Sequence, residues 1–160
     1  MMLKKMFFPI LNLVTLVILP LILNYYITLN YKESLEQLET LTNISIRSSL
    51  MFITAIGIMI TILSIAKSFS NKASFINLLS SLGMSLLWFL LLSFAISFGQ
   101  FPDGLIGMST IYIKTSPSMP LSEAIVVKFD FRFVMIFLAL SLMFSMLSDT
   151  LSFKEGLKHK

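Results

Sequence analysis

One carboxylate stands at the end of a long uncharged stretch near the end of the chain. Residues 133–148, which separate Arg132 from Asp149, carry no charge, and as a helix they cover only about 24 Å of a hydrocarbon core that is about 30 Å thick. Asp149 is therefore drawn toward the membrane, and its side chain is too short to reach back to water. We weigh two interpretations: an interfacial ion pair with Lys67 or Lys72, and a polar gate that binds a proton or a cation together with Asn77.

Small polar residues recur at helical spacing in three of the apolar stretches. Helices in lipid pack through such residues, because burying apolar side chains between two helices releases little free energy when lipid already surrounds them. The pattern predicts helix-packing seams, and the alternative is a hydrated path for a small solute. The predicted seam residues are Thr54, Gly57, Thr61 and Ser64 in one stretch and Ser141, Ser145 and Ser148 in the last. In the stretch between these two they are Ser81 and Ser85, which follow Ser74 and Asn77 on the same helix face.

Other chemistry has little support in the residue types. The chain has no cysteine and one histidine, His159 in the tail, so thiolate catalysis, iron–sulfur clusters and a haem held by two histidines of this chain are excluded. Met143 and Met146 are better explained by packing than by copper binding. Asp103, Glu123 and Asp130 are the carboxylates that acid–base catalysis could use. We expect no cofactor, no metal and, because the cations are scattered, no nucleic-acid partner.

The composition is that of a membrane protein. Of 160 residues, 56% are hydrophobic and 12% are charged, and the mean hydropathy is +0.90. About 20 consecutive apolar residues cross a bilayer as a helix. The sequence predicts one all-α membrane domain over residues 1–160, a bundle of four transmembrane helices over residues 7–29, 49–66, 73–98 and 133–151.

The distribution of cations predicts the orientation of these helices. Lys4, Lys5, Lys67, Lys72 and the lysines of the tail fall on one side, and the other side carries five cations against six acids. Because cationic residues near helix ends favour the cytoplasm, we expect both termini to be cytoplasmic, in the cell membrane. The outer loops are then residues 30–48 and 99–132.

Each outer loop has a pattern of its own. In the first, Leu35, Leu38 and Leu41 recur every three residues between acidic ones, which predicts a short amphipathic helix. In the second, residues 109–115 and 124–131 alternate in the manner of strands, and an eight-residue connection over 116–123 would join them as a hairpin. The leucines, Val127 and Phe129 are candidate docking residues for a partner.

These patterns favour a protein without catalytic activity of its own. The expectation is an accessory subunit of a larger membrane complex, with the bilayer and other membrane subunits, or further copies of itself, as partners. The alternative is a small homo-oligomeric channel or transporter protomer with its polar pathway near Asp149.

Overall fold

The computed structural model describes residues 2–71, 73–99 and 103–158. Lys72 and His159 lie outside the described residues, and so does the side chain of Asp103. Within the described ranges, four helices are long and apolar enough to cross a membrane, and a two-stranded antiparallel sheet joins the last two. This agrees with the predicted multi-pass helical architecture.

The first span is one continuous helical rod with a wider turn inside it. It consists of α1 (Met2–Leu13), a π-helical stretch (Val14–Ile18) and α2 (Leu19–Asn30). Pro20 has no N–H and cannot donate to the carbonyl of Leu16 four residues earlier. In the π-helical turn the Leu19 N–H donates instead to the Val14 carbonyl, five residues back. The proline is thus accommodated by a change of hydrogen-bond register.

The other three spans are uninterrupted α-helices. They are α4 (Ile46–Phe69), α5 (Phe75–Ile96) and α6 (Arg132–Lys158). The Ser45 and Ser74 hydroxyls cap α4 and α5, each by accepting a hydrogen bond from a first-turn amide. The α6 helix continues seven residues past the predicted end at Leu151. Asp149 therefore lies inside a helix rather than at its end.

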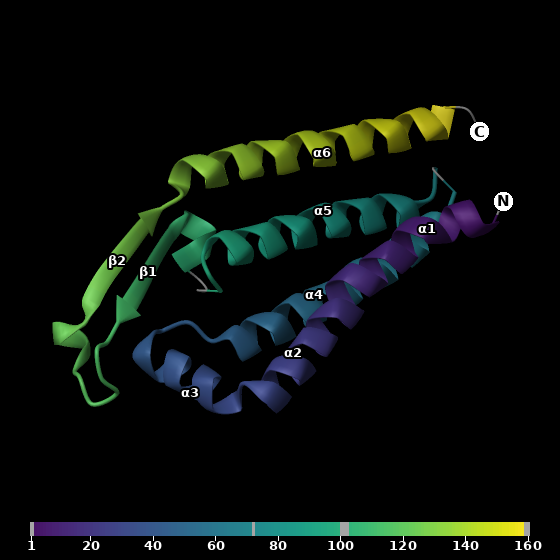
Figure 1. The fold of residues 1–160 in the computed structure, drawn as a ribbon. Helices are drawn as coiled ribbons and strands as arrows, with labels where there is room; N and C mark the ends of the chain where they lie inside the picture. Colours follow the sequence, from purple (N-terminus) through teal and green to yellow (C-terminus); the bar gives the residue numbers. More distant parts are fainter. Residues whose placement is uncertain (1, 72, 100–102, 159–160) are drawn as a thin grey trace.

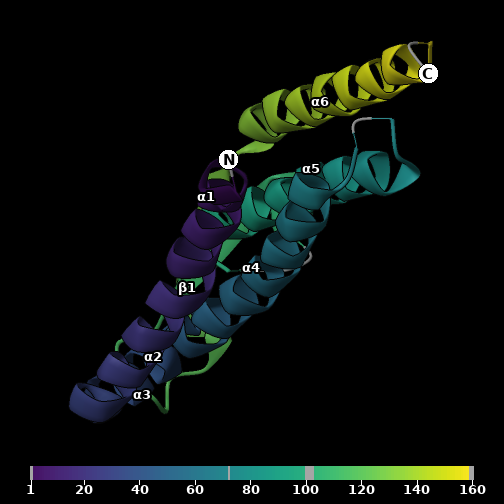
Figure 2. The ribbon, with the colours of Figure 1, turned by 90° about the vertical axis from the view of Figure 1, so that its right-hand side faces the viewer.

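The four spans lie in a row. The rod of α1 and α2 packs against α4, α4 packs against α5, and α5 packs against α6. Both termini lie at one end of the molecule, here called the terminal end, and the sheet lies at the other, the hairpin end (Figure 1). Figure 2 shows α1 and α6 as the outer members of the row. The buried core sits between α4 and α5 and consists of Ile56, Ile60, Leu87 and Leu91.

The hairpin pairs β1 (Met108–Ile113) with β2 (Ile125–Asp130) in antiparallel register. Ile111 lies opposite Val127 and Ile113 opposite Ile125, so these four residues share one face as the alternation predicts. The connection, residues 114–124, is longer than the expected eight residues. The reason is that Lys114 leaves the ladder and donates its N–H to the Leu41 carbonyl at 2.8 Å.

The first loop extends the sheet from its side. After α3 (Lys32–Leu41), the predicted amphipathic helix, Thr42 forms an isolated bridge with Ile113. The Asn43 side chain then pairs with β1 as the backbone of a neighbouring strand would. Its Nδ2 donates to the Thr110 carbonyl at 2.7 Å, and its Oδ1 accepts from the Tyr112 N–H at 2.9 Å. Two segments far apart in sequence are thus joined into one cap.

The cap is tied to the helices at two points. The buried Ser109 hydroxyl donates to the Ser97 carbonyl at the end of α5, at 3.0 Å. At the start of β1, Gly107 has a φ of +76° and accepts a hydrogen bond from the Phe131 N–H. A Cβ on Gly107 would lie 2.7 Å from Cα of Arg132. Only glycine fits where β1 crosses the start of α6.

Candidate functional site

Asp149 makes no ion pair or hydrogen bond among the described residues. It lies half-buried on α6, nine residues before the end of that helix. Lys67, in the last turn of α4, is half-buried and also has no acidic partner within 4.0 Å in the described part of the chain. The predicted pair of Asp149 with Lys72 falls outside the described residues.

Asn77 has a structural partner. Its Nδ2 donates to the Lys67 backbone carbonyl at 3.4 Å, across the tight turn between α4 and α5. Carbonyls in the last turn of a helix lack helical partners, and Asn77 supplies one for α4. The side chain therefore fastens two neighbouring helices together at the terminal end.

The polar stripe of α4 is buried. Thr54, Gly57, Thr61 and Ser64 all lie inside the molecule. The hydroxyls of Thr54 and Thr61 donate to the carbonyls of Leu50 and Gly57, four residues earlier in the same helix. The hydroxyls of Thr54 and Thr61 are thus satisfied within α4 rather than by a neighbouring helix.

The closest approach on this stripe is at Gly57. A Cβ added there would lie 2.7 Å from the Leu16 Cβ and 2.8 Å from the Leu16 carbonyl carbon, in the π-helical turn. Leu16, in the wider turn before Pro20, thus contacts Gly57, the one glycine of α4.

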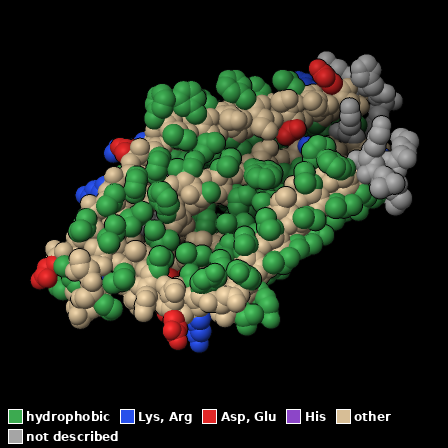
Figure 3. All heavy atoms as spheres, viewed as in Figure 1, with side chains coloured by type: hydrophobic (Ala, Val, Ile, Leu, Met, Phe, Trp, Pro, Cys, Tyr) green, Lys and Arg blue, Asp and Glu red, His purple; other side chains and the backbone are tan. Residues whose placement is uncertain are grey.

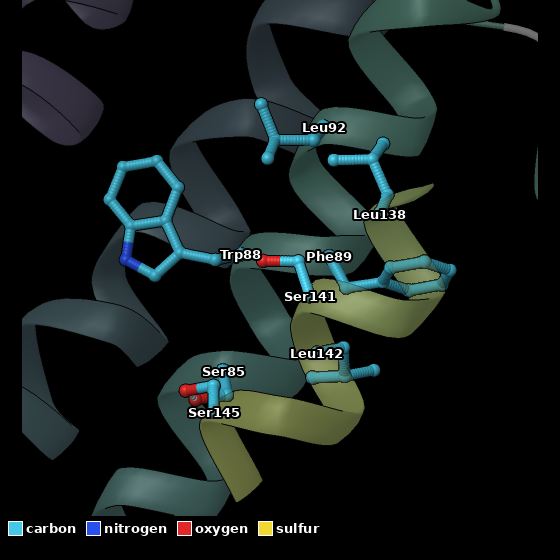
Figure 4. Close-up of a pocket in the computed structure, with 8 residues that line it drawn as sticks. All are labelled: Ser85, Trp88, Phe89, Leu92, Leu138, Ser141, Leu142 and Ser145. Carbon is cyan, nitrogen blue, oxygen red and sulfur yellow. Dashed lines mark hydrogen bonds between the residues drawn. The ribbon is translucent and has the colours of Figure 1, made fainter. Parts of the chain in front are cut away.

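A second contact joins α5 to α6 through serines. On α5, Ser81 is buried and Ser85 is half-buried. The Ser85 and Ser145 hydroxyls lie 3.0 Å apart, side by side where the helices meet (Figure 4). They flank a groove whose other walls include Trp88, Leu138 and Ser141. The Trp88 indole extends away from α6.

The serines of α6 are mostly not covered by the rest of the chain. Ser141, Ser145 and Ser148 are exposed, and α6 has α5 as its only extensive helical neighbour among the described residues. The opposite flank of α6 is apolar, with Leu140, Met143, Phe144 and Leu147 around a groove of about 480 Å³. The α6 helix therefore has an apolar flank that is suited to lipid. Its other flank, the serine flank, consists of Ser141, Ser145 and Ser148 and is not suited to lipid.

A larger groove opens on the other side of Trp88, between α1, α4 and α5. It encloses about 700 Å³. Figure 3 shows the corresponding face hollowed between the α6 arm and the α1–α2 arm. Its polar lining comes from three helices and consists of Asn12, Thr15, Ser64, Lys67, Ser68 and Trp88.

No pattern in the sequence predicts this groove. Asn12 and Thr15 belong to the weakest polar stripe of the four spans, and Trp88 is the only tryptophan of the chain. An asparagine inside an apolar span, where an unpaired amide is costly, is the signal that could have indicated it.

The candidate docking residues divide into covered and open positions. Leu35 is buried within the cap, and Leu41 and Val127 are half-buried. Phe129 packs against the rings of Phe98 and Phe131. Open apolar positions of the cap include Leu38, Ile113, Leu121 and Ile125.

Among the described residues, the charged groups of the cap form one local pair. Arg132 binds Asp130 through its guanidinium at 3.1 Å and through its backbone N–H at 3.0 Å. The backbone and side-chain hydrogen bonds from Arg132 lower the pKa of the Asp130 carboxyl below its ordinary value. The described residues contain no cluster of three or more His, Cys, Asp or Glu that could hold a metal ion.

No protein-family model, curated protein or solved structure matches the chain.

Proposed function

We propose that this protein is a non-enzymatic accessory subunit of a larger integral membrane complex. The observation that carries the proposal is the exposed serine flank of α6, which has α5 alone as an extensive helical neighbour in the described part of the chain. The Ser145 hydroxyl already meets Ser85 of α5. The Ser141 and Ser148 hydroxyls gain nothing from lipid, whereas a helix of another subunit can pack closely on small residues and bond to them. A transmembrane helix of a partner is the occupant that suits this flank.

The hairpin end supplies a second docking surface for the same partner. Ile113 and Ile125 lie opposite each other at the far end of the sheet, and both side chains are exposed. A two-stranded sheet is marginal by itself in water. Contact with another subunit would cover this pair and hold the cap.

The proposal is tested by isolating the protein from its own membranes in a mild detergent and measuring the mass of the intact complex. We expect other membrane proteins in fixed stoichiometry. Ser141→Leu with Ser148→Leu should release them, whereas Phe144→Leu, on the apolar flank, should not. Retention of every partner by the double serine variant would contradict the proposal.

A homo-oligomeric channel or transporter protomer is the second candidate. It is favoured by the hollow between α1 and α6, since copies arranged around that hollow would enclose polar groups from several helices. A complex that contains only this chain would support it. Asp149→Asn should then change solute flux in reconstituted vesicles without changing the mass of the complex.

A further inference from the structure

The groove between α1, α4 and α5 contains polar groups without partners. Among the described residues, the Asn12 amide, the Ser64 hydroxyl, the Lys67 ammonium and the Trp88 indole N–H make no hydrogen bond. The Thr15 and Ser68 hydroxyls of the same groove are satisfied, because each donates to a carbonyl of its own helix at 2.8 Å. The first four groups come from three different helices and remain available to one ligand.

The chemistry of these groups selects an anion. Ammonium and indole N–H can only donate hydrogen bonds, and the amide and the hydroxyl can also donate. None of the residues that line the groove is acidic. A ligand that accepts several hydrogen bonds and carries negative charge complements this set, and a phosphate group has both properties.

The position of Lys67 selects a lipid as the source of that phosphate. Lys67 lies two residues before the end of α4, at the terminal end, where a spanning helix meets the headgroups. The remaining walls are apolar and include Phe8, Leu11 and Met84, which suit an acyl chain. The volume of about 700 Å³ falls within the range of about 300–1,000 Å³ for ligand sites.

We propose that this groove binds an anionic phospholipid from the leaflet at the terminal end, with its phosphate at Lys67, Asn12 and Ser64 and an acyl chain along Phe8, Leu11 and Met84. Basic pockets between transmembrane helices bind anionic headgroups in this way. The lipid would fill the side of Trp88 that faces α1 and leave the serine flank of α6 open. The inference goes beyond the accessory role and does not depend on it.

The experiment is native mass spectrometry of the purified protein with added dioleoyl phosphatidylglycerol. We expect a retained lipid adduct on the wild-type chain and at least a tenfold smaller bound fraction for Lys67→Gln. The matched control is Lys154→Gln, since Lys154 is exposed on α6 and outside the groove; it should bind as the wild type does. Asn12→Ala tests the site without a change of charge and should also reduce binding.

Three results would overturn the proposal. Equal binding by the wild type, Lys67→Gln and Asn12→Ala would place the lipid elsewhere. Equal retention of phosphatidylcholine would remove the selection for negative charge. Displacement of the lipid by millimolar inorganic phosphate would make free phosphate the ligand. Circular dichroism of each variant shows that the helices are intact, and unchanged partner retention by Lys67→Gln separates this test from that of the accessory role.

Discussion

At the scale of single residues, Asn43 is the side chain that most directly connects distant parts of the chain. It exchanges two hydrogen bonds with the backbone of β1. It also begins the tripeptide Asn43-Ile44-Ser45, which fits the acceptor pattern for N-glycosylation. The nitrogen that a glycan would modify is the one that donates to Thr110, so a glycan at Asn43 would lie directly against β1.

We predict that Asn43→Ala loosens the cap by about 1–3 kcal/mol, because it leaves a carbonyl and an amide of β1 without these partners. Hydrogen exchange at the Tyr112 amide measures the effect and should become faster. Asn30→Ala is the control, since the Asn30 side chain bonds only within its own helix. Equal protection of the Tyr112 amide in Asn43→Ala and the wild type would show that the bridge carries no stability.

Asp130 gives the cap a dependence on pH. Arg132 lowers the pKa of Asp130 in the folded state, so the carboxylate stabilises the fold above the unfolded pKa of about 3.9, and this contribution is lost as the pH falls through the lower folded value. Asp130→Asn should therefore lower the melting temperature slightly at pH 6 and have no effect near pH 2. A difference between the two proteins that does not change with pH would contradict this.

At the scale of elements, the contact between α4 and the π-helical turn depends on the absence of a side chain at residue 57. Gly57→Ala would place a methyl group against the backbone of Leu16. We predict a loss of about 1–3 kcal/mol, as for overpacking of other interiors, measured by thermal unfolding in detergent.

Gly83→Ala is the matched control for this prediction. Gly83 is also a glycine within a spanning helix, but its added Cβ would meet only the end of the Leu63 side chain, at 2.8 Å. That side chain can move, and alanine is favoured over glycine in a helix. Gly83→Ala should be neutral or stabilising, and an equal loss in both variants would show that α1 does not approach α4 closely.

The elements differ in how far the sequence predicts them. The four spans and the hairpin follow from hydropathy and alternation, because lipid and the pleat impose those patterns on every residue of the element. The continuation of α6 to Lys158 was not predicted, since residues 152–158 carry three charges and the predicted span was ended before them. The side-chain bridge of Asn43 was not predicted. It depends on β1 lying beside residue 43, and no local sequence pattern gives the position of that strand relative to the first loop.

The neighbour relations of the helices also could not be predicted. Stripes of small polar residues on α4, α5 and α6 look alike in sequence, yet the first is buried and the last is exposed. The difference arises because α4 lies in the middle of the row and α6 at its edge. The groove at Lys67 has the same origin, since its polar groups come from three helices whose adjacency is a property of the fold.

At the scale of the whole molecule, the row of helices is open to a direct test because the chain has no cysteine of its own. The Ser85 and Ser145 oxygens are 3.0 Å apart, so Ser85→Cys with Ser145→Cys should form a disulfide under mild oxidation. Ser85→Cys with Ser152→Cys should not, because residue 152 lies nearly two helical turns further along α6. A similar yield from both pairs would mean that α6 does not keep a fixed register on α5.

The same absence of cysteine allows the orientation in the membrane to be measured. Four spans place both termini on one side and the cap on the other (Figure 1). Ser34→Cys and Ser118→Cys, in the two exposed segments of the cap, should therefore react alike with an impermeant thiol reagent on intact cells, and Lys154→Cys should react in the opposite manner. The distribution of cations predicts that the cap positions react on intact cells and Lys154→Cys only after lysis. The reverse result would invert the orientation and keep the fold, whereas different behaviour of Ser34→Cys and Ser118→Cys would show that the two loops do not form one cap.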